Sequence, residues 1–256
     1  GLHVSMDGGA NWQPLARLDP NDRFPISASD FGAAFSTEGT VLVSQALQDM
    51  YGLYRASITP AGQLSVWKPV FDIPASRLGL SPDGDTALAY GTALWRSIDG
   101  GQTWRQVGAG LSGIENLQPG PFLFSPDFVN DNTVYFFFGG DSNQSGILFQ
   151  STDGGQSWQQ WQSPDNSRIF TAITTASNGE FILGDSQTNL LQLAANQINW
   201  KQSTLPNFRF PLDDIAGAGR DVLLAVSRQH ALFKSNNGGK SWQPTDLPAR
   251  SSGFTL

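Results

Sequence analysis

The octapeptide SIDGGQTW, from Ser97 to Trp104, has three relatives along the 256-residue chain. They are SMDGGANW, STDGGQSW and SNNGGKSW, and they begin at Ser5, Ser151 and Ser235. Each octapeptide follows a short apolar run, so a strand is expected to enter a tight turn at the paired glycines. We call this Ser-x-Asp/Asn-Gly-Gly-x-x-Trp pattern the hairpin motif.

The spacing of the hairpin motifs predicts further, degenerate copies. The first serines are 92, 54 and 84 residues apart, and the two long intervals are each about twice a unit of 40 to 50 residues. Segments that keep the apolar strand, the turn and the terminal Trp occur inside both long intervals. They are LYRASITPAGQLSVW from Leu53 and LLQLAANQINW from Leu190.

A second repeated pattern has the same period and consists of a strand end, a polar turn and another strand. Its copies are FSTEGTVLVS from Phe35, LSPDGDTALAY from Leu80, FSPDFVNDNTVYFFF from Phe124, TASNGEFILG from Thr175 and AGAGRDVLLAV from Ala216. The two patterns together define a unit of four strands, A to D, with the hairpin motif between C and D.

Units of this length with four strands each predict an all-β fold, a β-propeller of four-stranded antiparallel blades. We expect strands C and D within residues 1–16, complete blades at about 25–70, 75–108, 119–163, 167–205 and 209–246, and another strand A from Ser251 to Leu256. This arrangement corresponds to a six-bladed propeller with five complete blades and one shared or partial blade. Residues 1–256 then form a single domain, or the chain is a fragment of a longer protein.

The composition agrees with an all-β chain and excludes several functions. It has 28 Gly, no Cys, and only three Glu against 19 Asp, which favours strands and turns over helices. A net charge of −7 disfavours nucleic acid as a partner. No apolar run approaches the ~18 to 20 residues of a membrane helix, so no direct membrane insertion is expected. The small charged fraction, 14%, favours an exported protein, whether periplasmic, cell-surface or secreted.

The residue types of the hairpin motif have a structural explanation that needs no ligand, metal or cofactor. The glycines permit positive φ, the Asp carboxylate accepts backbone N–H groups of its own turn, and the Trp packs on the sheet. The residues assigned this structural role are Ser5, Asp7, Trp12, Ser97, Asp99, Trp104, Ser151, Asp153, Trp158, Ser235 and Trp242.

In this motif the chain resembles the Asp-box family, or bacterial neuraminidase repeats. That family includes sialidases, xyloglucanases, sortilin-type receptors and photosystem II assembly-factor propellers. Three copies match the pattern fully, whereas the copy at Ser235 has Asn237 in place of the Asp. The resemblance implies a propeller with the motif on its outer rim, away from the central channel where ligands bind.

Function is therefore expected at one end of the blades. If strand A lines the channel, the D-to-A and B-to-C loops form one end, which we call the loop end. The A-to-B and C-to-D turns form the other, the turn end. An Arg stands near the entry to strand A in most units: Arg23, Arg77, Arg168, Arg209 and Arg250. Such a ring could bind a carboxylate, a sulfate or an acidic protein patch. The alternative is that each Arg pairs with a nearby Asp or stacks on an aromatic ring.

Two classes of function remain open. The favoured one is a non-catalytic propeller that binds a protein partner or a glycan, or that serves in a larger assembly. The alternative is a glycoside hydrolase of sialidase or xyloglucanase type at the channel mouth. The resemblance implies a Tyr nucleophile and a Glu for a sialidase, but Tyr54, Tyr90 and Tyr135 are expected to pack within strands. Carboxylates available for a xyloglucanase-like site are Asp30, Asp72, Asp141, Asp185, Asp213 and Asp214.

Overall fold

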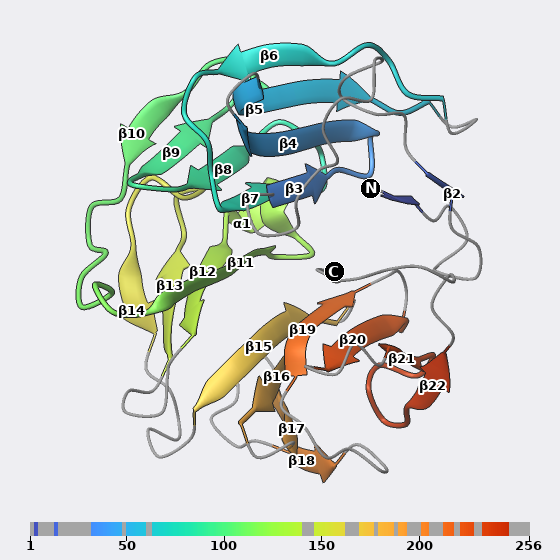
Figure 1. Ribbon diagram of the computed structural model, residues 1–256. Helices are drawn as coiled ribbons and strands as arrows, with labels where there is room; N and C mark the ends of the chain where they lie inside the picture. The colour runs from blue at the N-terminus through green and yellow to red at the C-terminus, as the bar shows by residue number, and fades with distance from the viewer. Residues whose placement is uncertain are drawn as a thin grey trace. The chain divides into compact units, whose positions relative to one another are not determined.

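Five antiparallel sheets of four strands form a β-propeller in the computed structural model (Figure 1). The structure describes residues 3–4, 13–14, 32–47, 50–59, 63–139, 146–161, 169–176, 179–186, 189–193, 201–204, 212–217, 221–227 and 232–245. In every blade the spatial order of the strands is their order along the chain. The predicted all-β propeller with four-stranded blades is confirmed.

The blades lie within one residue of the ranges that the repeats predict. The first blade contains β3 (Gly32–Phe35), β4 (Thr40–Leu47), β5 (Met50–Ser57) and β6 (Lys68–Phe71). The second contains β7 (Arg77–Leu80), β8 (Ala87–Tyr90), β9 (Leu94–Ser97) and β10 (Arg105–Val107). The third contains β11 (Gln118–Phe124), β12 (Val134–Gly139), β13 (Ile147–Ser151) and β14 (Gln159–Trp161).

The fourth blade contains β15 (Phe170–Thr175), β16 (Phe181–Asp185), β17 (Asn189–Leu193) and β18 (Lys201–Thr204). The fifth contains β19 (Leu212–Gly217), β20 (Leu223–Ser227), β21 (Leu232–Ser235) and β22 (Gln243–Thr245). β1 (His3–Val4) pairs with β2 (Gln13–Pro14) in a separate two-stranded sheet. The strand expected from Ser251 lies outside the described residues, so a sixth blade stays a prediction.

The chain divides into two compact units. The first unit comprises Gly1–Leu111, Asp127–Tyr135 and Gln150–Gln159, and the second comprises Ser112–Pro126, Phe136–Phe149 and Gln160–Leu256. Within the first unit β3 contacts β7, and within the second β15 contacts both β11 and β19. The first strands of successive blades therefore lie next to one another inside each unit.

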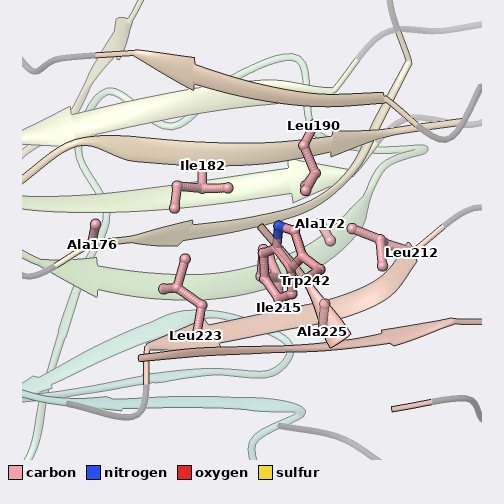
Figure 2. Close-up of a cluster of buried hydrophobic side chains, with 9 residues drawn as sticks. All are labelled: Ala172, Ala176, Ile182, Leu190, Leu212, Ile215, Leu223, Ala225 and Trp242. Atoms are coloured by element: carbon pink, nitrogen blue, oxygen red, sulfur yellow. The ribbon is translucent and has the colours of Figure 1, made fainter. Parts of the chain in front are cut away.

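Apolar side chains fill the space between neighbouring blades. In the first unit, Leu42 and Leu53 of the first blade cluster with Leu78 and Ala87 of the second. In the second unit, Trp242 lies among apolar side chains of the fourth and fifth blades, including Leu190 and Leu212 (Figure 2). Strands covered on both faces carry apolar side chains in both directions. This explains the nearly continuous burial of β8, β12 and β16.

The aromatic side chains of β12 and β14 pack against neighbouring strands. Tyr135, Phe136, Phe137 and Phe138 of β12 are all buried. The rings of Phe122 and Phe136 are stacked with centroids 4.1 Å apart. Trp161 is partly buried, and its ring centroid lies 5.9 Å from that of Phe181. Trp161 therefore has a packing partner in the neighbouring blade.

One element differs from the expectation. The polar turn predicted after Phe124 contains a short helix, α1 (Phe128–Asp131). Phe128 is buried in this turn, and Asn132 ends the helix in the left-handed region with φ of 50°. Strand periodicity does not reveal this short helix or its one buried ring.

Each described hairpin motif is hydrogen-bonded to strand C of the blade before it. Arg55 Nε donates to the Gly100 carbonyl at 2.8 Å, and Arg96 Nε donates to the Gly154 carbonyl at 2.6 Å. Gln192 Nε2 donates in the same way to the carbonyl of Gly238, at 2.8 Å. We call this side-chain contact the blade latch. The same position of strand C thus joins three pairs of consecutive blades.

The second glycine of the motif lies against strand B of the preceding blade. Gly101 has φ of +85°, and a Cβ there would lie 2.7 Å from Leu42 Cδ2. Gly155 has φ of +88°, and a Cβ there would lie 2.7 Å from Leu88 Cδ2. Glycine is required at this position both for its backbone conformation and for the closeness of the neighbouring blade.

Removal of one latch should destabilise the fold. Arg96→Ala deletes a hydrogen bond from a charged donor to the buried Gly154, a loss of about 1.5 to 3 kcal/mol. For a chain of this length we expect the melting temperature to fall by roughly 3 to 10 °C in calorimetry. Arg105→Ala is the control, because Arg105 is exposed and bonds the exposed Gln156. Equal melting temperatures for both variants would contradict the role of the latch.

Candidate functional site

The Asp of the hairpin motif holds its own turn through several hydrogen bonds. Asp99 Oδ1 accepts from the Ser97 hydroxyl at 2.7 Å and from the backbone N–H groups of Gln102 and Thr103 at 3.0 and 2.9 Å. Asp99 Oδ2 accepts from the Thr103 hydroxyl at 2.6 Å. Ser97 Oγ in turn accepts from the Gly101 N–H at 2.9 Å. Both carboxylate oxygens are thus used inside the turn.

The motif at Ser151 repeats this geometry. Asp153 Oδ1 accepts from the Ser151 hydroxyl at 2.7 Å, and Asp153 Oδ2 accepts from the Ser157 hydroxyl at 2.6 Å. Ser151 Oγ accepts from the Gly155 N–H at 2.8 Å. Two separate blades therefore build the same turn with the same set of bonds.

The copy at Ser235 has Asn237 in place of the Asp, and the side-chain amide of Asn237 keeps the same turn. Asn237 Oδ1 accepts from the Ser241 N–H at 2.9 Å, as the Asp does in the other copies. Asn237 Nδ2 donates to Ser241 Oγ at 2.8 Å. The substitution is accommodated because a serine hydroxyl can accept as well as donate.

The terminal Trp of the motif is anchored in two of the three described copies by its indole N–H. Trp104 Nε1 donates to the Gly101 carbonyl at 3.0 Å, and Trp242 Nε1 donates to the Gly239 carbonyl at 3.1 Å. Trp158 is buried, with 5% of its surface exposed. The predicted structural residues Ser5, Asp7 and Trp12 lie outside the described residues.

The electrostatics of the motif favour a permanently ionised Asp. Partial burial works to raise the pKa of Asp99, but the hydrogen bonds from Ser97, Thr103 and Gln102 outweigh it and hold the pKa at about 2. The same balance holds the pKa of Asp153 at about 2. A general acid at neutral pH needs a raised pKa. These two carboxylates are unsuited to that role.

Of the predicted arginine ring, the described residues include Arg77 alone. It is the first residue of β7, partly buried, and pairs across the sheet with Tyr90 at the end of β8. Its Nη1 donates to the Ser76 carbonyl at 2.9 Å. The other predicted members, Arg23, Arg168, Arg209 and Arg250, lie outside the described residues. Arg77 has the predicted place at the entry to strand A.

The carboxylates of the loop end have different environments. Asp185 is only 2% exposed, and its two oxygens accept from the N–H and the side-chain amide of Asn189, both at 2.8 Å. Asp72 is exposed after β6, and Asp214 is partly buried and accepts from the Ile215 N–H at 2.9 Å. Asp30, Asp141 and the side chain of Asp213 lie outside the description. Asp185 therefore closes the turn between β16 and β17.

The three tyrosines expected in strands lie in β5, β8 and β12. Burial, and then the charge of Asp72, raise the pKa of Tyr54. Burial alone raises the pKa of Tyr90, and it is also the main cause of the raised pKa of Tyr135. A tyrosine nucleophile is activated by a lowered pKa or an adjacent base, so these pKa shifts oppose that role.

Two β-bulges at the loop end of the second unit were not foreseen. The register between β15 and β16 shifts between Phe170 and Ala172, and that between β19 and β20 shifts between Leu212 and Asp214. Thr171 and Asp213 are the extra residues. A bulge redirects the side chains that follow it, and such irregularities are common beside functional sites. No alternation or turn residue in the sequence signals either bulge.

In the described part of the chain, no three or more His, Asp or Glu side chains are grouped so as to hold a metal ion. Within the same residues, no helix is long and apolar enough to cross a membrane.

No family model matches the sequence. The chain is 23% identical over 201 residues to the photosystem II stability/assembly factor HCF136, chloroplastic, of Cyanidioschyzon merolae, covering 72% of this chain and 44% of that protein. It is 24% identical over 213 residues to the xyloglucanase Xgh74A of Acetivibrio thermocellus, covering 65% of this chain and 24% of that protein. The chain spans less than half the length of these curated relatives.

Solved structures of a GH74 enzyme and of YCF48 share the fold of this chain. The GH74 enzyme of Niastella koreensis superposes with a TM-score of 0.60 at 17% identity, covering 84% of this chain and 38% of that one. YCF48 bound to a D1 peptide superposes with a TM-score of 0.53 at 16% identity, covering 93% of this chain and 72% of that one. The chain has the fold of these β-propellers. An enzyme and a peptide-binding protein are thus both built on it.

The ionised motif carboxylates predict a pH dependence of stability. Their pKa falls from the ordinary 3.8 to about 2 on folding, so their contribution is complete above about pH 4. It is lost as the pH falls through about 2. Asp99→Asn combined with Asp153→Asn removes this titration, and the native Asn237 shows that the turn accepts an amide.

The measurement is urea unfolding of both proteins between pH 7 and pH 2. We expect the wild-type protein to lose more unfolding free energy than the double variant over the acid part of this range. Parallel pH profiles for the two proteins would refute a stabilising role for the two ionised carboxylates.

Proposed function

We propose that this chain is a non-catalytic Asp-box β-propeller that binds a protein partner or a glycan as an assembly module of an exported or surface protein. In this proposal residues 1–256 belong to one propeller domain. The supporting observation is that Asp99, Asp153 and Asp185 each direct both carboxylate oxygens to groups of their own turn. Carboxylates bonded in this way stabilise loops and are poorly placed to transfer protons.

The loop end is the proposed binding surface. Arg77 starts β7 there, beside the phenol-bearing Tyr90 on the adjacent strand. A guanidinium and a phenol together can bind an anionic group and stack on a planar one. The similar YCF48 structure holds a peptide of D1, which supports a peptide or protein ligand for this fold. Arg23, Arg168, Arg209 and Arg250 would extend the same surface if the ring closes as the repeats predict.

A glycoside hydrolase remains the second candidate, because a xyloglucanase is among the relatives and a GH74 enzyme shares the fold. This function requires two carboxylates on either side of a glycosidic bond. Among the carboxylates that the sequence analysis names for this role, the described ones besides Asp185 are Asp72 and Asp214. In this reading one of them would act with a carboxylate outside the described residues.

Binding at the loop end can be tested with an octa-aspartate peptide as the probe. Arg77→Ala should lower its affinity roughly tenfold in fluorescence anisotropy, since a charged hydrogen bond contributes about 1.5 to 3 kcal/mol. Arg168→Ala combined with Arg209→Ala should abolish binding. Arg105→Ala should leave the affinity unchanged, because Arg105 starts β10 at the opposite end of its blade. Unaltered binding in the variants of Arg77, Arg168 and Arg209 would contradict the proposal that these arginines bind an anionic ligand.

Hydrolysis distinguishes the two functions. The protein should release no reducing sugar from xyloglucan and no fluorophore from a panel of glycosides. Turnover that disappears in Asp72→Asn, with the melting temperature preserved, would replace the binding proposal by the hydrolase.

A further inference from the structure

The exposed apolar side chains gather at the turn end of the first unit. Among the described residues, the large hydrophobic side chains that are exposed are Phe35, Val66, Ile98 and Val129, with 44%, 82%, 64% and 68% of their surface accessible. Phe35 ends β3, Val66 precedes β6, Ile98 follows β9 and Val129 lies in α1. Single exposed hydrophobic residues are normal, but these four share one end of three consecutive blades.

The same turns carry a concentrated negative charge. Within the described residues 36–39, 58–59, 63–67, 81–86, 97–104, 127–133 and 151–158, which we call the turn face, there are seven carboxylates. The carboxylates are Glu38, Asp83, Asp85, Asp99, Asp127, Asp131 and Asp153. Four basic residues adjoin the turn face. Lys68 and Arg105 begin β6 and β10 directly after two of these turns, and Arg55 and Arg96 donate to the carbonyls of Gly100 and Gly154. The seven carboxylates and the four adjoining basic residues together give this end a net charge of −3.

Hydrogen bonds tie these turns to one another. The Thr37 N–H donates to the Pro82 carbonyl at 3.2 Å, which joins the A-to-B turns of the first and second blades. The Gly100 N–H donates to the Asp85 carbonyl at 2.8 Å, and the Gly154 N–H donates to the Asn132 carbonyl at 2.9 Å. With the blade latches of Arg55 and Arg96, these bonds preorganise the turn face, which lowers the entropic cost of binding.

We propose that the turn face binds a basic amphipathic segment of a partner protein. Lys and Arg side chains of the segment would neutralise the carboxylates, and its apolar side chains would cover Ile98, Val129 and Phe35. A second copy of this face would bring two surfaces of net negative charge together. Nucleic acids and anionic membranes would be repelled for the same reason. The inference rests on the proposed binding function but assigns it a second surface, separate from the loop end with Arg77.

The probe is a fluorescein-labelled 18-residue peptide of Lys and Leu arranged as an amphipathic helix. Its binding is followed by fluorescence anisotropy at 50 and 150 mM salt. A peptide of the same composition with scrambled order is the control for non-specific attraction to an acidic protein. We expect saturable binding of the amphipathic peptide, with at least tenfold weaker binding of the scrambled one.

Two double variants test the two components of the surface. Ile98→Ser with Val129→Ser should weaken binding about tenfold through lost apolar burial. Serine is suitable at position 98 because Thr152 and Asn236 occupy the corresponding place in other hairpin motifs. Glu38→Gln with Asp85→Asn should weaken binding about fivefold or more at 50 mM salt and less at 150 mM salt. Asp72→Asn, at the loop end, should change nothing.

Each possible result decides the proposal. Unchanged binding in both double variants, equal binding of the scrambled peptide, or an equal loss in Asp72→Asn would overturn it. So would a wild-type dimer in sedimentation that Ile98→Ser with Val129→Ser makes monomeric, because the face would then join two copies. The turn-face variants should still bind the octa-aspartate peptide. If only the octa-aspartate peptide fails to bind, that result counts against the loop-end function and leaves the turn-face proposal intact.

Discussion

The structure depends on one contact that recurs between consecutive blades. The first glycine of each described hairpin motif donates its N–H to the A-to-B turn of its own blade and accepts a side-chain hydrogen bond from the blade before. The second glycine lies so close to the preceding strand B that a Cβ would collide with Leu42 or Leu88. A local turn therefore also serves as a joint between blades. This double use explains why glycine recurs in pairs.

The acidic side chains that maintain the fold differ from the side chains that are available for recognition. Asp99 and Asp153 are ionised and fully engaged in their turns, and Asp185 closes a loop. Their charges still contribute to the field at the protein surface, although their oxygens are already hydrogen-bonded. The two proposed binding surfaces use side chains that the turns only position, such as Arg77 at the loop end and Ile98 at the turn end.

The prediction of the fold succeeded because its signals are local and repeated. A hairpin needs its turn residues within a few positions, so the motif at Ser97 or Ser151 is visible in the sequence, and its spacing gives the blade. The degenerate copies at Leu53 and Leu190 were found by the same period, and both lead into strands of complete blades. The helix α1 is not visible in the sequence because four residues with one buried ring, Phe128, form no repeating pattern.

The sequence by itself determined the class of fold, the number of strands per blade and the residues of each hairpin motif, since these follow from short-range pattern. Only the tertiary structure decided that Arg55, Arg96 and Gln192 reach the next blade, since their partners are 45, 58 and 46 residues away. It also decided the bulges of β15 and β19 and the clustering of exposed apolar and acidic side chains at one end. These features depend on which turns become neighbours when blades pack, and no local sequence pattern contains that information.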